Sequence, residues 1–196
     1  MDDKKSLSQI QMKTRPKIDD VISDVLGGEK LEAALEFIAY LKEHKLNLRW
    51  ASANTWVVKY KGVNILYIRL TGAEFFTHRK NIESGSWLIS PPFNVRGDYG
   101  DLHNDNHFKQ VVWSNVNYCA ACIKCKPGKT YVILGKEISG VCHSILNFIN
   151  PGQEGIEIVK KLLNFGMAEA DRSAARNGTA SKPLLSTKTM GLVRLG

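Results

Sequence analysis

The four cysteines are the residues of this chain whose type and spacing could do chemistry. They are Cys119, Cys122, Cys125 and Cys142, in the pattern C-x2-C-x2-C-x16-C, and the 196-residue sequence has no others. Structural cysteines are usually scattered singly through a core, so this gathering predicts a shared role. A C-x2-C turn places two thiolates on one side of a tight loop, as a tetrahedral metal requires. We therefore expect a metal site with four cysteine ligands in a knuckle over residues 117–142.

Zn2+ is the expected metal, because a zinc site would contribute folding energy to a small lobe. An iron–sulfur cluster is the alternative cofactor, since C-x2-C-x2-C with a remote fourth cysteine resembles the ligand run of bacterial ferredoxins. Redox-active thiols are a further alternative, because Lys124 and Lys126 lie between and beside the cysteines and favour thiolates. Disulfides explain the cluster poorly in a reducing compartment.

Three histidines are weaker candidates for metal ligands. His143 follows Cys142 and could replace one sulfur, but adjacent residues of a strand point to opposite faces, so only one of the two would reach the metal. His103 and His107 lie among aspartates without the H-E-x-x-H pattern, so a solvated loop is the better interpretation.

A net charge of +8 could attract polyanions. Trp56 and Tyr67 lie on predicted strands that also carry Lys59 and Arg69, an interleaving that single-stranded nucleic-acid binders use for stacking. The same residues also build the core of an ordinary antiparallel sheet, which we favour. The sequence contains no Walker loop, G-x-G-x-x-G or G-x-S-x-G motif, so no residue is assigned a catalytic role and we favour binding over catalysis.

The elements that must position the cysteines follow from the periodicity of apolar residues. Helical spacing predicts helices over Glu29–Lys45 and Gln153–Phe165. Strands are predicted at 48–51, 55–60, 63–70, 86–90, 130–134 and 141–149, with Lys61-Gly62 as a tight hairpin turn. The predicted fold class is α+β, a mainly antiparallel sheet of about five strands covered by helices, with the four-cysteine knuckle attached.

The predicted domain organisation has three parts. Residues 1–17 form a flexible arm, residues 18–166 a single α+β domain that includes the knuckle, and residues 167–196 a flexible basic tail. The apolar stretches are too short to cross a bilayer, and the N-terminus lacks the apolar core of a signal peptide. We therefore expect a cytoplasmic protein with no membrane partner.

Two segments resemble known families. Leu35–Leu70 followed by Ser86–Pro91, a helix and a Trp-containing hairpin with a Lys-Tyr-Lys-Gly turn, is similar to small bacterial α+β domains of the MmcQ/YjbR and YdhG kind, families mostly of uncharacterised function. Cys119–Cys142, with Cys-Lys-Pro-Gly-Lys and Leu-Gly-Lys-Glu-Ile, resembles a cysteine-bearing tail in uncharacterised proteins of Gram-positive bacteria. Neither resemblance transfers a catalytic residue.

Together these observations predict a soluble bacterial protein that acts as a zinc-stabilised binding or regulatory module. Its partner would be a small molecule, a protein or a polyanion, recognised through the sheet and the basic loops. The alternatives are an iron–sulfur or thiol redox protein and a nucleic-acid-binding protein.

Overall fold

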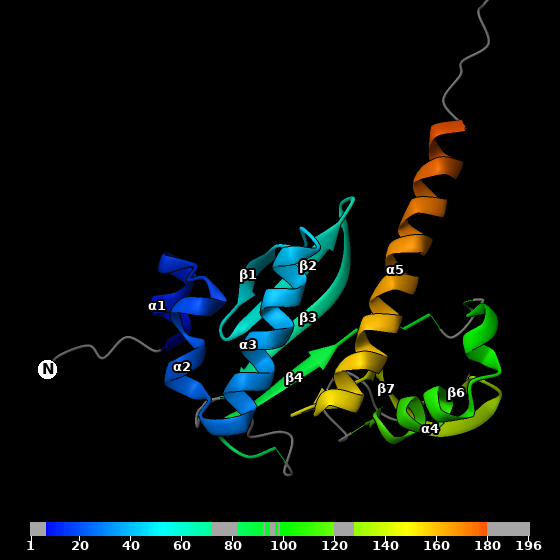
Figure 1. Ribbon diagram of the computed structural model, residues 1–196, viewed down its shortest axis with the longest axis horizontal. Helices are drawn as coiled ribbons and strands as arrows, with labels where there is room; N and C mark the ends of the chain where they lie inside the picture. The colour runs from blue at the N-terminus through cyan, green and yellow to red at the C-terminus, as the bar shows by residue number, and fades with distance from the viewer. Residues whose placement is uncertain are drawn as a thin grey trace, which may run out of the picture.

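The computed structural model describes residues 7–71, 82–91, 93–94, 97, 99–119 and 128–179 (Figure 1). The helices of this part are α1 (Leu7–Thr14), α2 (Ile22–Val25), α3 (Gly28–Glu43), α4 (Asn106–Ser114) and α5 (Gln153–Thr179), with 3-10 helices η1 (Ile18–Asp20) and η2 (Gly100–His103). The strands are β1 (Leu48–Ser52), β2 (Thr55–Tyr60), β3 (Val63–Thr71), β4 (Ser86–Ser90), β5 (Val116–Tyr118), β6 (Lys129–Ile133), β7 (Lys136–Leu146) and β8 (Phe148–Ile149). The predicted α+β class is confirmed.

The strands form two antiparallel sheets. The large sheet has the order β1-β2-β3-β4-β8, and the small sheet has the order β5-β7-β6. The predicted turn between β2 and β3 is confirmed, because Lys61 and Gly62 both have positive φ angles, 46° and 82°, as a two-residue hairpin turn requires. The sequence predicted one sheet of about five strands, and the small sheet is an addition to it, built from β5, β6 and β7.

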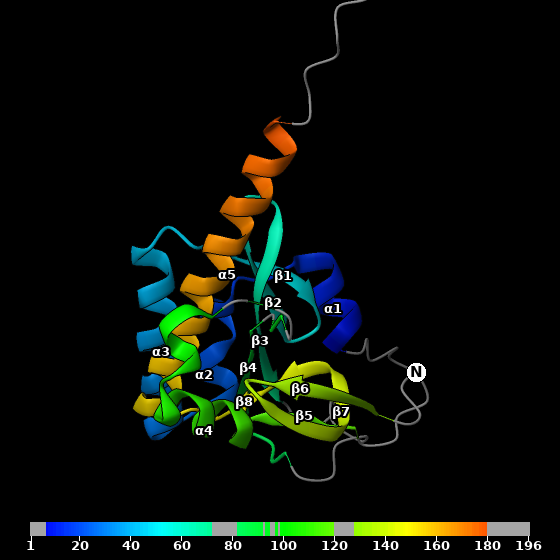
Figure 2. The same cartoon turned by 90° about the vertical axis from the view of Figure 1, so that its right-hand side faces the viewer.

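One face of the large sheet is the core of the molecule. Trp56, Ile68, Ile89 and Phe148 pair in register across four neighbouring strands, and each is at most 1% exposed. Both α3 and α5 lie on this inner face (Figure 2). The Phe37 ring of α3 lies 6.3 Å, centroid to centroid, from Trp87 on the inner face of β4. The predicted cover of the sheet by these two helices is therefore observed.

The buried stripe of α3 differs by one position from the predicted one. Helical spacing predicts a stripe of Leu31, Leu35, Ile38 and Leu41 with Ala34 beside it, but Leu35 is 42% exposed, whereas Ala34 and Phe37 are buried. Successive residues of a helix are rotated by about 100° from each other, so a stripe through positions 34, 37, 38 and 41 turns Leu35 towards its edge.

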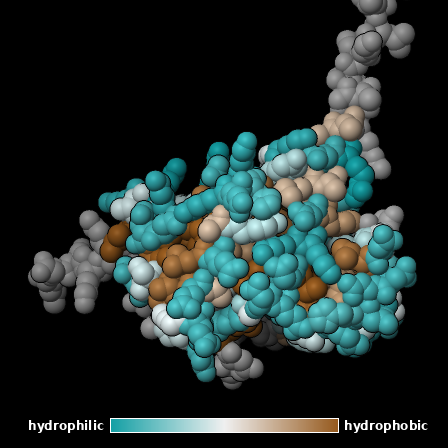
Figure 3. Space-filling model, in the orientation of Figure 1, coloured by the Kyte–Doolittle hydropathy of each residue, from teal (hydrophilic) through white to brown (hydrophobic). Residues whose placement is uncertain are grey.

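On the face shown in Figure 3, hydrophobic side chains appear among the helices on the left, while hydrophilic side chains cover most of the rest.

Helix α4 fastens the small sheet to the rest of the core. Asp105 caps this helix, and its side chain accepts a hydrogen bond from the Phe108 backbone N–H at 2.9 Å. That bond, together with the nearby Lys161 ammonium, lowers the pKa of Asp105. The Trp113 indole N–H donates to the Ile133 carbonyl in β6 at 2.7 Å. Phe108 and Val112 belong to one hydrophobic cluster that includes both sheets, so the two sheets share a core.

The chain passes from the small sheet to the large sheet through a single residue, Asn147. It lies between the last residue of β7 and the first residue of β8 and is 5% exposed. Its backbone N–H donates to the Asn115 carbonyl at 3.0 Å. Its Oδ1 accepts hydrogen bonds from Ser90 of β4 at 2.6 Å and from Ser144 of β7 at 3.2 Å. One buried amide thus joins the two sheets.

The N-terminal region differs from the predicted flexible arm. Residues 7–14 form α1, which places the buried side chain of Gln11 against the β1–β2 turn. Gln11 Nε2 donates to Asn54 Oδ1 at 2.7 Å, and the Asn54 backbone N–H donates to Gln11 Oε1 at 2.7 Å. The polar composition of this segment concealed the helix, because its anchor is an amide pair instead of an apolar stripe.

The C-terminal region also differs from prediction over part of its length. Helix α5 continues past Phe165 to Thr179 and extends beyond the sheets (Figure 1). Asp171 lies 2.7 Å from the Lys61 ammonium at the β2–β3 turn, and this ion pair lowers the pKa of Asp171. Residues 180–196 lie outside the described residues. No helix in the described ranges is long and apolar enough to cross a membrane.

Replacing Gln11 tests the anchor of α1. In Gln11→Ala the buried Asn54 N–H loses its acceptor, so we expect a loss of about 1–3 kcal/mol in the free energy of unfolding. Urea denaturation measures it. The control is Lys13→Ala on the exposed side of α1, and equal stability of the two variants would contradict the role of the amide pair.

Replacing Asn147 tests the corner between the sheets. Asn147→Ala leaves the hydroxyls of Ser90 and Ser144 without their shared acceptor, and we expect a loss of about 1–3 kcal/mol in the free energy of unfolding. The matched control is Asn64→Ala, which removes an exposed asparagine from β3. In thermal and urea unfolding, Asn147→Ala should have a clearly lower melting temperature and free energy of unfolding than Asn64→Ala. An Asn147→Ala protein as stable as this control would contradict the structural role of the corner.

Candidate functional site

Two of the four predicted cysteine ligands lie in the described part of the chain, one in the small sheet and one directly after its strand β5. Cys119 directly follows β5, and its backbone N–H donates to the Gly140 carbonyl of β7 at 2.8 Å. Cys142 lies two residues further along β7 and is 8% exposed. Cys122 and Cys125 belong to residues 120–127, outside the described residues.

The described residues on either side of this segment, Cys119 and Gly128, meet at the same point of β7. A Cβ atom added to Gly128 would lie 2.5 Å from the carbonyl carbon and oxygen of Gly140 and 2.8 Å from the Cβ of Cys119. Real Cβ atoms essentially never approach so closely, so only glycine fits at position 128. Cys119, Gly128 and Gly140 therefore form a tight junction, and in the sequence Cys122 and Cys125 lie between the first two of these residues.

The described residues contain no group of three or more His, Cys, Asp or Glu side chains that could hold a metal ion. Because only two of the four cysteines are among them, the predicted set of four cysteine ligands is not tested and stays a prediction. His103 and His107 do not gather with a third ligand there. His103 stacks on Tyr99 with ring centroids 6.4 Å apart, and His107 Nε2 lies 3.2 Å from a Glu154 oxygen.

A bulge interrupts β7 and begins at Cys142. Val116 pairs with Leu146 and Tyr118 with Val141, so residues 142–145 of β7 stand opposite the single residue Asn117 of β5. Asn117 Nδ2 donates to the Ser144 carbonyl at 2.7 Å and satisfies one of the acceptors that the bulge exposes. Bulges redirect side chains and are common beside functional sites. Here Cys142 is buried, whereas the next residue, His143, is exposed.

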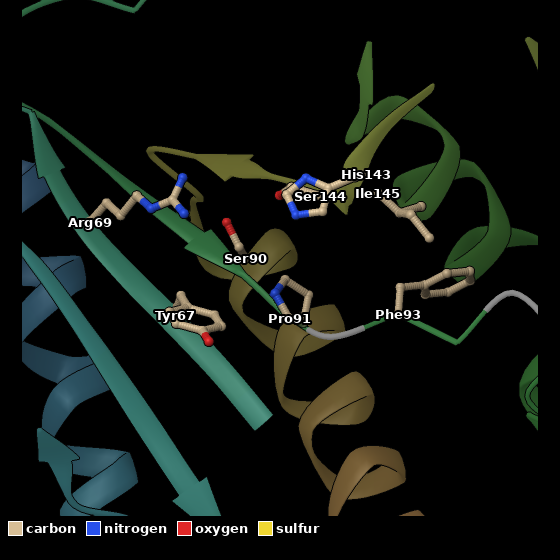
Figure 4. A pocket seen from close by; sticks show the side chains of 8 residues that line it. All are labelled: Tyr67, Arg69, Ser90, Pro91, Phe93, His143, Ser144 and Ile145. Carbon is tan, nitrogen blue, oxygen red and sulfur yellow. The ribbon is translucent and has the colours of Figure 1, made fainter. Parts of the chain in front are cut away.

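The bulge forms one wall of a pocket between the two sheets (Figure 4). The pocket has a volume of about 430 Å³. The described residues that line it come from β3, from β4 and the residues after it, and from the β7 bulge: Tyr67, Arg69, Ser90, Pro91, Phe93, His143, Ser144 and Ile145. We call this cavity the inter-sheet pocket.

The large sheet supplies its wall of the pocket from the face opposite the core. Ile68 points inward, so its neighbours Tyr67 and Arg69 lie on the outer face, and Tyr67 pairs with Ser90 across β3 and β4. The sequence interpretation treated Tyr67 as a core aromatic, but it is only half-buried on this outer face. The alternation of side chains along β3 could have indicated that Tyr67 lies on the outer face of the large sheet. The local sequence pattern could not have indicated that β7 lies against this outer face.

The described lining of the inter-sheet pocket is basic and rich in hydroxyl groups. Arg69 from β3 and His143 from β7 lie on opposite sides, with Ser90 between them (Figure 4). No carboxylate is among the described lining residues. Ser90 and Ser144 both donate their hydroxyl protons to Asn147 Oδ1, so their oxygens can take part in further hydrogen bonds only as acceptors. The described lining therefore brings a guanidinium and serine hydroxyl oxygens to one cavity.

Comparison with protein-family models, with curated proteins and with solved structures finds no match to this chain. The resemblances to MmcQ/YjbR- and YdhG-like domains and to the cysteine-bearing tails of Gram-positive proteins stay predictions.

Substituting Gly128 tests the junction with Cys119 and Gly140. Gly128→Ala places a methyl group against the Gly140 backbone, and such overpacking costs about 1–3 kcal/mol. We expect a lower melting temperature and altered amide signals for Cys119 and Gly140 in NMR spectra. Gly152→Ala is the control, because a Cβ at that glycine would meet no atom within 4 Å. A Gly128→Ala protein as stable as the control would contradict the junction.

Proposed function

We propose that this chain is a zinc-stabilised binding module. The small sheet holds one Zn2+ through Cys119, Cys122, Cys125 and Cys142, and the inter-sheet pocket beside it is the binding site. No residue is given a catalytic role in this proposal. The observation that carries it is the junction of Cys119, Gly128 and Gly140, two residues from Cys142.

The length of the chain makes a four-sulfur site feasible at this junction. Cys122 is three residues from Cys119, and Cys125 is three residues from Gly128, so each can lie at most about 11 Å along the chain from the junction. Cys142 is two residues beyond Gly140, at most about 7 Å along an extended strand. All four sulfurs can thus reach a common point at about 2.3 Å from one zinc ion.

Zinc also suits the role of the small sheet. β5 is only three residues long and pairs with one edge of β7, and the bulge interrupts this pairing. A structural zinc contributes free energy to folding directly, without a large apolar core. By joining Cys119 to Cys142, the metal would hold together β5 and β7 at the position where their ladder is weakest.

The metal is tested on protein purified without added metal or chelator. We expect about one zinc per chain and no visible absorption, because Zn2+ has a filled d shell. Cys119→Ser should lose the zinc and lower the melting temperature. Tyr118→Ser, at an exposed neighbouring position, should retain the zinc.

Two results would contradict this proposal. Iron with sulfide and visible absorption would make the cluster a redox centre, the alternative that the C-x2-C-x2-C spacing allows. Absence of any bound metal, with Cys119→Ser as stable as the native chain, would leave the cysteines without a ligand role.

A further inference from the structure

We propose that the inter-sheet pocket binds a small hydroxylated oxyanion, a sugar phosphate or a hydroxy acid, with the anionic group against Arg69. This inference deepens the proposed binding function and rests on it for the choice of site. It depends only on described residues, so it can fail or succeed separately from the zinc site.

Arg69 provides the anchor for the anionic group. It lines the pocket from the outer face of β3, and its guanidinium points towards the cavity and the His143 side (Figure 4). A guanidinium presents a planar set of donors that fits carboxylate and phosphate oxygens in pairs. The described lining contains no acidic side chain that would repel such a group.

The two serines favour a ligand that also carries hydroxyl groups. Their oxygens lie in the pocket as acceptors, because both protons are directed to Asn147 Oδ1 at 2.6 Å and 3.2 Å. The hydroxyls of a ligand can donate to such acceptors, whereas a plain inorganic anion has few or no protons to donate. Asn147 is buried at the corner of the sheets, so the acceptors are fixed before the ligand arrives.

The remaining lining limits the size and shape of the ligand. Pro91, Phe93 and Ile145 give the pocket an apolar side onto which the carbon skeleton of a small molecule can pack. The volume of about 430 Å³ is near the lower end of the range for small-molecule sites, about 300–1,000 Å³. Both features favour a compact metabolite over a polymer segment that would cross the open surface.

Arg49 provides a matched control for the charge of Arg69. The residues Arg49, Val57, Tyr67 and Ser90 pair in register across β1 to β4, so Arg49 lies on the same outer face as the pocket. It is exposed and does not line the inter-sheet pocket. Arg49→Gln and Arg69→Gln therefore remove the same charge from the same face, and only the second removes it from the pocket.

The test is a titration of the full chain with ribose 5-phosphate, malate and neutral ribose, followed by amide NMR spectra, on a sample whose zinc content is measured. We expect saturable shifts with one or both anions, centred on Arg69, Ser90, His143 and Ser144, and none with ribose. The anion that binds more tightly identifies a phosphate or a carboxylate ligand. Arg69→Gln should weaken that binding about ten- to hundredfold, whereas Arg49→Gln should leave it within about twofold of the native chain.

Three results would overturn the inference: no saturable shift with either anion, equal binding of ribose, or equal weakening by the two substitutions. A folded, zinc-containing chain that binds neither anion would reject this ligand class and leave the metal proposal intact. Binding that depends on Arg69 in a chain without zinc would support the inference and reject the metal.

Discussion

The arrangement of the whole molecule depends on the corner at Asn147. The residue ends the small sheet and begins the last strand of the large one, so its backbone must change direction inside the core. A buried amide without partners would be costly there, and the structure satisfies it from Asn115, Ser90 and Ser144. Because these partners come from β4, β7 and the end of α4, one residue sets how the two sheets and the helix between them are placed.

Both candidate sites follow from what this corner imposes on β7. The strand must pair with β5 and β6 and still deliver Phe148 to the inner face of the large sheet, and it accommodates this with a bulge over residues 142–145. The bulge buries Cys142 beside the Cys119–Gly128–Gly140 junction and turns His143 and Ser144 towards Arg69. The proposed metal site and the proposed ligand pocket would thus lie on the same strand without sharing a residue.

Much of the fold could be predicted from the sequence because its signals are local. Residue types and turn chemistry predicted β4 over Ser86–Ser90 and the Lys61-Gly62 hairpin. Helix α1 could not be predicted, because its fixed position comes from the Gln11–Asn54 pair, which joins residues 43 apart. The predicted inward face of α3 differs by one position from the observed one, because Leu35 is apolar but lies outside the stripe that meets the sheet.

The sequence by itself determined the type of elements such as α3, β2 and β4, the α+β class and the gathering of all four cysteines within a short stretch, since propensity, period and spacing are properties of neighbouring residues. It also carried Arg69 and His143, but as unrelated residues of two distant strands. Only the tertiary structure decided that the outer face of β3 meets the β7 bulge, because such contact depends on the corner at Asn147 and on packing between segments more than seventy residues apart. The cysteine spacing is thus a feature of the sequence, whereas the inter-sheet pocket exists only in the folded chain.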